Sequence, residues 1–181
     1  MPAPRQSPNS NVMVGDAARA KSIFTRQQGQ GTYWFGKVIG AFAQLMNVAE
    51  QEGNTRLRND LLALLEERLE GWFRSDGNGH FVQDARLGTL LGYPDEYGSV
   101  TNMNDHHFHY GYWLNAAAQV ALRDPAWADK KRWGGMVDLI AADIATAGRG
   151  GADYPFVRNY DDGQAPRPIS PFRYRRRHRG R

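Results

Sequence analysis

The sequence comprises 181 residues with a formal net charge of +4 and no cysteine. This length is enough for one hydrophobic core, and the lack of cysteine excludes a disulfide framework and a thiolate metal site. The positive charge would suit a nucleic-acid partner, but residues 173–181 alone contain six arginines and leave the remainder slightly acidic. No apolar run approaches the roughly 18 residues of a membrane-spanning helix, so no membrane partner is expected.

Residues 1–30 are predicted to be poorly ordered or to contain one short helix. Proline, serine and asparagine dominate the first 12 residues, a composition that favours disorder. Residues 12–26 could form the helix, and a loop rich in glycine and glutamine follows it.

Two helices joined by a tight turn are predicted for residues 33–52 and 55–73. Leucine and aromatic residues recur at helical spacing in both segments. Gly53 can end the first helix, and Asn54 or Thr55 can cap the start of the second. A three-residue joint between two amphipathic helices predicts an antiparallel hairpin.

The second half of the chain predicts another pair of helices. A turn, a short strand at residues 81–83 and a long loop lead to a helix over residues 105–122. Asp124 and Pro125 are expected to start a fourth helix that reaches Thr146, with the aspartate as N-cap and the proline in the first turn. Four helices in two hairpins with long loops predict an all-α fold, either a bundle or a toroid.

The segment Asn104–Trp113, N-D-H-H-F-H-Y-G-Y-W, is rich in groups that can bind or react. With 100° per residue in a helix, Asp105, His109 and Tyr112 share one stripe. A carboxyl group, an imidazole and a phenol that project together fit a sugar-binding cleft, where rings stack on pyranose C–H groups and polar tips bond hydroxyls. A neighbouring stripe, better suited to packing, consists of His106, Tyr110, Trp113 and Ala117.

The run Asn104–Tyr112 resembles the signature of glycoside hydrolase family 81, the endo-β-1,3-glucanases. Three further segments resemble the family in the same order: Tyr33–Lys37, Gly88–Pro94 and Tyr154–Asp161. The likeness covers residues 31–161. Residues 162–181 form a basic tail that is predicted to be disordered, and that reads as truncated or out-of-frame sequence.

The resemblance implies a helical catalytic module, an (α/α)6 toroid of which this chain supplies about two hairpins. It also implies β-1,3-glucan such as laminarin as the substrate, hydrolysis with inversion, a monomer, no cofactor and no catalytic metal. An intact parent enzyme is expected to act outside the cell, although residues 1–11 lack the apolar centre of a secretory signal.

The resemblance assigns the role of general acid to Asp105. Glycoside hydrolysis uses two carboxyl groups, and in inverting enzymes the second activates a water molecule roughly 6.5–9.5 Å from the first. Crowding by aromatic rings favours a protonated carboxyl group, whereas a helix N-terminus and a protonated His109 favour its anion. Asp105 could instead merely cap the helix, for which Asn104 is an equally good candidate.

The second carboxyl group is missing from its expected place. The resemblance puts the catalytic base in a downstream segment, but residues 162–181 contain no glutamate. We therefore expect the chain as given to be an inactive fragment of a glucanase. Two alternatives stay open: a fragment that binds β-glucan without cutting it, and a protein whose basic tail binds nucleic acid or another anionic surface.

Seven further residues are predicted to bind the glucan, with ordinary packing or ion pairing as an open alternative. They are Asp84, Tyr93, His107, His109, Tyr112, Arg158 and Asp161. The family usually has tryptophan at the position of Leu87, so one stacking platform could be absent here. Pairs of the clustered histidines and Asp105 could also share a metal ion with a third ligand from elsewhere, but no metal site is assigned.

Overall fold

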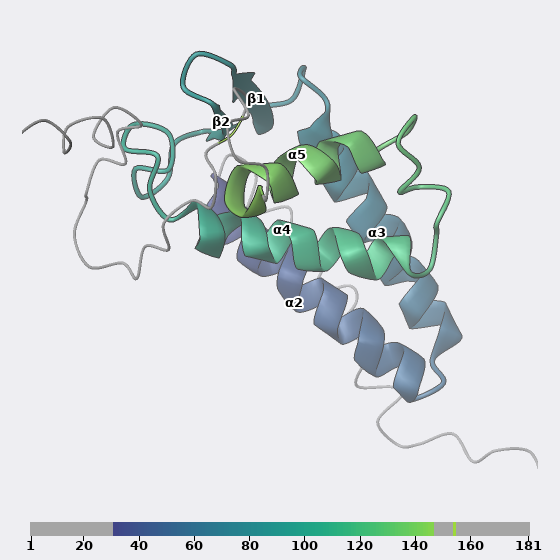
Figure 1. Cartoon of the computed structure of the whole chain (residues 1–181). Coiled ribbons are helices and arrows are strands. Elements are labelled where there is room, and N and C mark those ends of the chain that lie inside the picture. Colours follow the sequence, from purple (N-terminus) through teal and green to yellow (C-terminus); the bar gives the residue numbers. More distant parts are fainter. Residues whose placement is uncertain (1–30, 147–153, 155–181) are drawn as a thin grey trace, which may run out of the picture.

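The computed structural model describes residues 31–146 and residue 154, so the predictions for residues 1–30 and for the tail lie outside the described part. Four helices dominate it: α2 Thr32–Gln51, α3 Thr55–Phe73, α4 His106–Ala121 and α5 Gly134–Ala145. An antiparallel hairpin of two strands, β1 His80–Asp84 and β2 Thr89–Tyr93, comes between α3 and α4 in the chain and lies above α5 in the view of Figure 1. The predicted helical character is confirmed. No helix within residues 31–146 is long and apolar enough to cross a bilayer.

The helices pack as two layered pairs in which α2 contacts both α3 and α4, and α4 also contacts α5 (Figure 1). α2 and α4 run in the same direction. His109 near the start of α4 meets Thr32 at the start of α2, whereas Arg123 beyond the end of α4 meets Glu50 near the end of α2. The N-termini of both helices therefore lie at the same end of the molecule.

The α2–α3 hairpin forms as the sequence predicts. α3 has the predicted bounds, and α2 is shifted by one residue at each end. The side chain of Asn54 accepts a hydrogen bond from the Leu57 amide at 3.1 Å, which is the expected N-cap of α3. Gly53 has a φ of +70°, a left-handed conformation that glycine adopts without strain just after a helix.

The prediction that Asp124 starts a helix reaching Thr146 is wrong, because residues 124–133 form turns and α5 begins only at Gly134. Asp124 does accept hydrogen bonds from two of the next backbone amides, as an N-cap would. The chain then folds back on itself, since the Gly134 amide donates to the carbonyl of Asp129. Trp127, which is fully buried, anchors this reversal in the core.

The β1–β2 hairpin is more extensive than the single short strand that the sequence predicts. The strands pair from Asp84 opposite Thr89 to His80 opposite Tyr93. The first four residues of β2 are all buried, so this strand lacks the polar–apolar alternation that marks a half-exposed strand. The hairpin packs against α3 and α5, and its second strand leads into the segment that connects it to α4.

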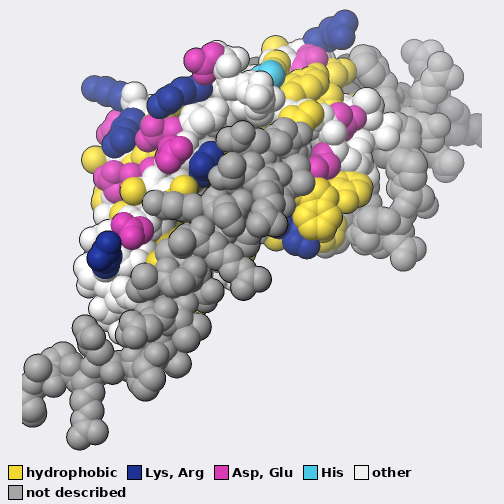
Figure 2. Space-filling view, turned by 180° about the vertical axis from the view of Figure 1, so that it is seen from behind, with side chains coloured by type: hydrophobic (Ala, Val, Ile, Leu, Met, Phe, Trp, Pro, Cys, Tyr) yellow, Lys and Arg dark blue, Asp and Glu magenta, His cyan; other side chains and the backbone are white. Residues whose placement is uncertain are grey.

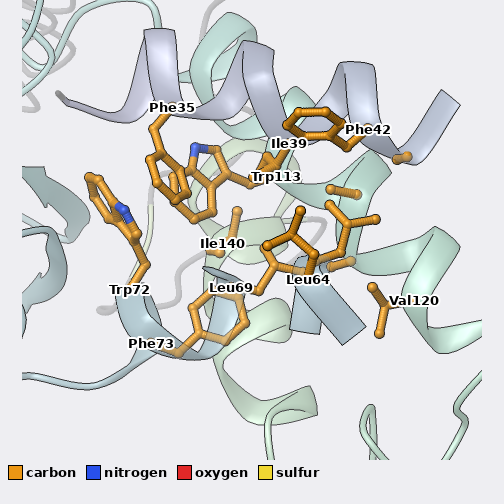
Figure 3. Packing of buried hydrophobic residues seen from close by; sticks show 14 of the residues in the cluster. Phe35, Ile39, Phe42, Leu64, Leu69, Trp72, Phe73, Trp113, Val120 and Ile140 are labelled. Atoms are coloured by element: carbon orange, nitrogen blue, oxygen red, sulfur yellow. The ribbon is translucent and has the colours of Figure 1, made fainter. Parts of the chain in front are cut away.

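Trp113 lies at the centre of an aromatic core (Figure 3). Its ring stacks on Phe35 with 5.3 Å between centroids and meets Trp72 and Phe81 at steep angles. Its indole Nε1 donates to the carbonyl of Thr32 at 2.9 Å. Because Thr32 is the first residue of α2, this buried bond fixes the start of α2 against α4.

Packing on α4 follows the predicted stripe. His106, Tyr110, Trp113 and Ala117 are all buried, and Figure 3 shows the Trp113 ring pointing toward residues of α2 and α3. The interior thus holds one side of α4, and this sets the direction in which its other residues point.

Candidate active site

A pocket opens at the end of the molecule where α2 and α4 begin. We call it the aromatic pocket, and it is lined by Tyr33, Trp34, Tyr97, Asp105, Phe108 and His109. Its volume is about 320 Å³, within the size range of small-molecule sites. Four of these residues are Tyr, Trp or Phe and present large aromatic rings. Asp105 is the only carboxylic acid among the described residues that line the pocket. Such a lining suits a sugar, which offers both C–H faces and hydroxyl groups.

Asp105 lies in the pocket with a strained backbone. Its φ of 55° and ψ of 21° are left-handed, a conformation that is uncommon outside glycine, although aspartate and asparagine adopt it more often than most residues, and that concentrates at functional sites. It occupies the N-cap position of α4, but its side chain makes no capping hydrogen bond. The alternative role as a simple helix cap is therefore wrong. Its Oδ2 instead accepts a hydrogen bond from the Asn104 side chain at 3.1 Å.

The next residue, His106, ties this strained position to three other elements. Its Nε2 donates to the carbonyl of Ser99 at 2.8 Å, and its Nδ1 lies 2.5 Å from Oδ2 of Asp143 on α5. Oδ1 of Asp143 accepts hydrogen bonds from the Thr89 hydroxyl and from the following backbone amide, both at 2.8 Å. All these side chains are buried. The network thus connects the start of α4 to α5, to β2 and to the loop before α4.

His109 lines the pocket but is only 1% exposed, so it is less accessible than a cleft-wall residue would be. Its Nδ1 lies 2.8 Å from the hydroxyl of Thr32. Burial, the largest cause, and the neighbouring His106 together lower the pKa of His109 to about 4, although Asp95 opposes the shift. His109 is therefore neutral near pH 7. It does not supply the positive charge that the sequence suggested as a stabiliser of the Asp105 anion.

The depressed pKa makes stability depend on pH. Unfolded His109 regains its ordinary pKa of 6.5, so between pH 6.5 and 4 the unfolded chain binds a proton that the folded chain does not. Acidification through this window should lower the free energy of unfolding, by on the order of 3 kcal/mol from this residue. Urea denaturation of the wild type and of His109→Gln at several pH values measures it. The variant should lose this part of the slope, and equal slopes would contradict the prediction.

Tyr33, Trp34 and Tyr97 form one wall of the pocket. The Tyr33 ring meets Trp34 and Tyr97 edge-on, with 5.1 and 5.2 Å between centroids. The indole Nε1 of Trp34 donates to the hydroxyl of Tyr97 at 3.1 Å. Trp34 and Tyr97 remain 41% and 58% exposed, and Lys37 covers Trp34 with its Nζ 5.0 Å from the ring centroid. Figure 2 shows a cluster of hydrophobic side chains exposed on one side of the molecule.

Trp34 and Phe108 were not singled out by the sequence analysis. Trp34 falls outside the apolar stripe of α2, where Phe35 and Ile39 face the core. A large aromatic residue that leaves the packing face, in the first turn of a helix, is a signal that could have identified it. Phe108 likewise lies between the buried residues of α4 and is 37% exposed.

Two of the predicted glucan-binding residues do not line the pocket. Tyr112 is one turn along α4, and its ring contacts Tyr33 with 6.1 Å between centroids. Tyr93 ends β2 and stacks on His80, with ring centroids 5.7 Å apart. Both therefore support neighbouring rings.

The other predicted binding residues are placed differently. Oδ1 of Asp84 accepts hydrogen bonds from the amides of Arg86 and Leu87 and thereby shapes the turn between β1 and β2. His107 is half-buried and does not line the aromatic pocket. Arg158 and Asp161 lie outside the described residues.

The histidine cluster does not converge on one point. Both ring nitrogens of His106 are hydrogen-bonded within the protein, and Nδ1 of His109 contacts Thr32. Over residues 31–146 no three or more His, Asp or Glu side chains are placed to hold a metal ion.

Comparison with known sequences identifies the family of this chain. The family described as "Glycosyl hydrolase family 81 C-terminal domain" matches residues 9–163. The chain is 47% identical over 133 residues to the "Glucan endo-1,3-beta-D-glucosidase" of Acetivibrio thermocellus, and 41% identical over 132 residues to that of Thermobifida fusca. The matches cover 72% and 71% of this chain but only 17% of each relative.

Comparison with solved structures points to the same family. A mutant of a protein described as "Glycoside hydrolase family 81 from Clostridium thermocellum" superimposes with a TM-score of 0.68 at 39% sequence identity. The match covers 89% of this chain and 23% of that one, so the chain spans less than a quarter of its relatives. On the extent of the family match and the similarity of both sequence and fold, this chain belongs to glycoside hydrolase family 81 and represents a part of its helical C-terminal domain.

Proposed function

We propose that the aromatic pocket is part of the β-1,3-glucan cleft of an inverting endo-β-1,3-glucanase, with Asp105 as the general acid. The observation that carries the proposal is the placement of Asp105. It is a carboxylic acid in a pocket otherwise walled by rings, and it is held in a left-handed conformation without a capping role. Relatives named as glucan endo-1,3-beta-D-glucosidases support the choice of substrate.

In this proposal the pocket holds a glucosyl unit by its faces and its hydroxyl groups. The exposed rings of Trp34 and Tyr97 stack on the C–H face of the sugar. Neutral His109 and Asp105 bond its hydroxyl groups or the glycosidic oxygen. His107, Tyr112, Tyr93, Asp84, Arg158 and Asp161 stay predictions for contacts elsewhere along the cleft.

Asp105 would act by giving its proton to the glycosidic oxygen as the bond to the sugar carbon breaks. An inverting reaction also needs a second carboxyl group, roughly 6.5–9.5 Å away, to take a proton from the attacking water. Since Asp105 is the one carboxylic acid among the described pocket residues, the base would come from outside the described part. We therefore propose that the 181-residue chain binds glucan as a monomer without hydrolysing it, and that an intact parent is a secreted enzyme.

Replacing Trp34 with alanine should weaken the binding of a laminari-oligosaccharide by about tenfold, which corresponds to about 1.4 kcal/mol. The reason is the loss of a stacking face that is already 41% exposed, so the core keeps its packing. Isothermal titration calorimetry of the 181-residue chain with laminarihexaose gives the Kd.

Leu122→Ala is the matched control, because Leu122 is also an exposed apolar residue, lying beyond the other end of α4. This variant should keep the wild-type Kd. If the wild type binds laminarihexaose and Trp34→Ala binds it equally well, the stacking role is wrong. If the folded wild type does not bind at all, the proposed function is wrong.

A further inference from the structure

The loop before α4 is shaped from within by Asp95. Its Oδ1 accepts a hydrogen bond from the Val100 amide at 2.9 Å, and its Oδ2 accepts one from the Thr101 amide at 3.2 Å. Burial alone would raise the pKa of Asp95, but the hydrogen bonds from Val100 and Thr101 outweigh it and hold the pKa below its ordinary value. Asp95 therefore makes residues 95–101 a compact unit.

The next residue, Glu96, reaches out of this unit to another helix. Its Oε2 accepts hydrogen bonds from the backbone amides of Tyr33 and Trp34, at 2.8 and 3.0 Å. These amides belong to the first turn of α2, where backbone N–H groups have no acceptor within the helix itself. The residue that precedes α2 is Gly31, which has no side chain to cap them. Glu96 supplies the missing cap from more than sixty residues away and gains from the helix dipole.

The backbones also approach closely at this point. A Cβ atom on Gly31 would lie 2.5 Å from Cβ of Glu96 and 2.6 Å from the carbonyl oxygen of Pro94. Contacts of that length do not occur, so the observed docking of the loop on α2 requires glycine at position 31. This is independent of the hydrogen bonds that Glu96 makes.

The two segments that Glu96 joins, the start of α2 and the loop before α4, each carry one ring of the pocket wall. Trp34 is one of the two residues whose amides are capped, and Tyr97 directly follows Glu96. The two rings meet in the bond from the Trp34 indole to the Tyr97 hydroxyl. Tyr97 has a φ of 55°, so this arrangement works against a backbone preference and needs an outside hold.

We infer that Glu96 is a positioning residue that clamps the loop to the start of α2 and so fixes Trp34 and Tyr97 as one wall for a glucosyl unit. Glu96 itself does not line the aromatic pocket, so it acts through these two rings. The role of the wall rests on the proposed function, whereas the clamp itself rests on geometry alone.

The test follows the Trp34 indole N–H of the ¹⁵N-labelled 181-residue chain by NMR, with the signal assigned by its absence in Trp34→Phe. In Glu96→Ala this signal should shift toward the position of a free indole and exchange with water at least tenfold faster. The Kd for laminarihexaose should rise about tenfold. Glu96→Gln keeps an acceptor oxygen and should restore both values at least in part.

Gly31→Ala tests the same clamp without a change of charge. Its methyl group would displace Glu96 and Pro94, so the Trp34 signal and the Kd should change as in Glu96→Ala. Gly71→Ala on α3 is the matched control, since a Cβ there meets no atom within 4 Å. It should leave both readouts at the wild-type values.

The clamp by Glu96 and the binding of glucan can fail independently in these experiments. If Glu96→Ala lowers only the melting temperature and leaves the Trp34 signal unchanged, Glu96 is a helix cap and the inference is overturned. An unchanged Trp34 signal in folded Gly31→Ala overturns it as well. If the signal changes in both variants but the wild type does not bind laminarihexaose, the clamp is supported and the proposed function fails.

Discussion

Replacing Asp105 with asparagine should lower the rate of β-1,3-glucan hydrolysis by about three orders of magnitude, as expected for the loss of a general acid. Asparagine keeps the size of the side chain but cannot give a proton to the leaving oxygen. The rate is measured in a chimera in which this chain replaces the matching segment of the 47% identical Acetivibrio thermocellus relative, because that relative supplies the remainder of the domain. Release of reducing sugar from laminarin gives kcat and KM.

Two further readouts distinguish an acid from a residue that merely binds. The active chimera should lose rate at alkaline pH as its acid gives up the proton, and Asp105→Asn should lack this alkaline limb. A substrate with a good leaving group, which needs less protonation, should lose much less rate in the variant. Asp60→Asn, at an exposed position of α3, serves as the control and should keep the rate of the parent chimera. A rate for Asp105→Asn above a tenth of the parental rate would reject the assignment.

Replacing Asp143 with alanine should lower the free energy of unfolding by about 3–5 kcal/mol, because a buried carboxyl group with three hydrogen-bonding partners is removed. The substitution leaves Nδ1 of His106, the Thr89 hydroxyl and a β2 amide buried without their acceptor. Urea denaturation of the 181-residue chain, followed by far-UV circular dichroism, measures the change. Asp143→Asn keeps one acceptor oxygen and should lose less.

Asp138 provides a control on the same helix. It pairs with Lys130 at 3.5 Å, but the two side chains are 64% and 86% exposed. Removing it should change the free energy of unfolding by less than about 0.5 kcal/mol. A loss below about 1 kcal/mol for Asp143→Ala would show that the network around His106 does not stabilise the fold.

The helical hairpin of α2 and α3 could be predicted because its signals are local. The apolar spacing and the Asn54 cap depend only on residues within a few positions of each other, and the structure confirms both. The prediction for the residues after Asp124 was wrong because it, too, rested on local signals. Its aspartate caps a turn as the local pattern indicates, but the burial of Trp127 and the return of the chain to Gly134 are tertiary effects.

For the candidate site, too, only the features with a local sequence signal could be predicted. The sequence identified the cluster around Asp105 by composition, and the structure brings Asp105 and His109 together in one pocket. It could not identify Glu96 as the cap of α2, nor Asp143 as the partner of His106, because neither has a local pattern. The bond from His106 to Asp143 crosses 37 positions of the chain, and the bond from Tyr33 to Glu96 crosses 63.

These separations have a kinetic consequence. The α2–α3 hairpin joins neighbouring segments and can form quickly, whereas contacts between distant segments must first overcome the entropy of closing a long loop. The bonds from Glu96 to α2 and from His109 to Thr32 close loops of 63 and 77 residues. We therefore expect the pocket to form after the α2–α3 hairpin, so a chain that has folded only this hairpin would present no surface shaped for a sugar.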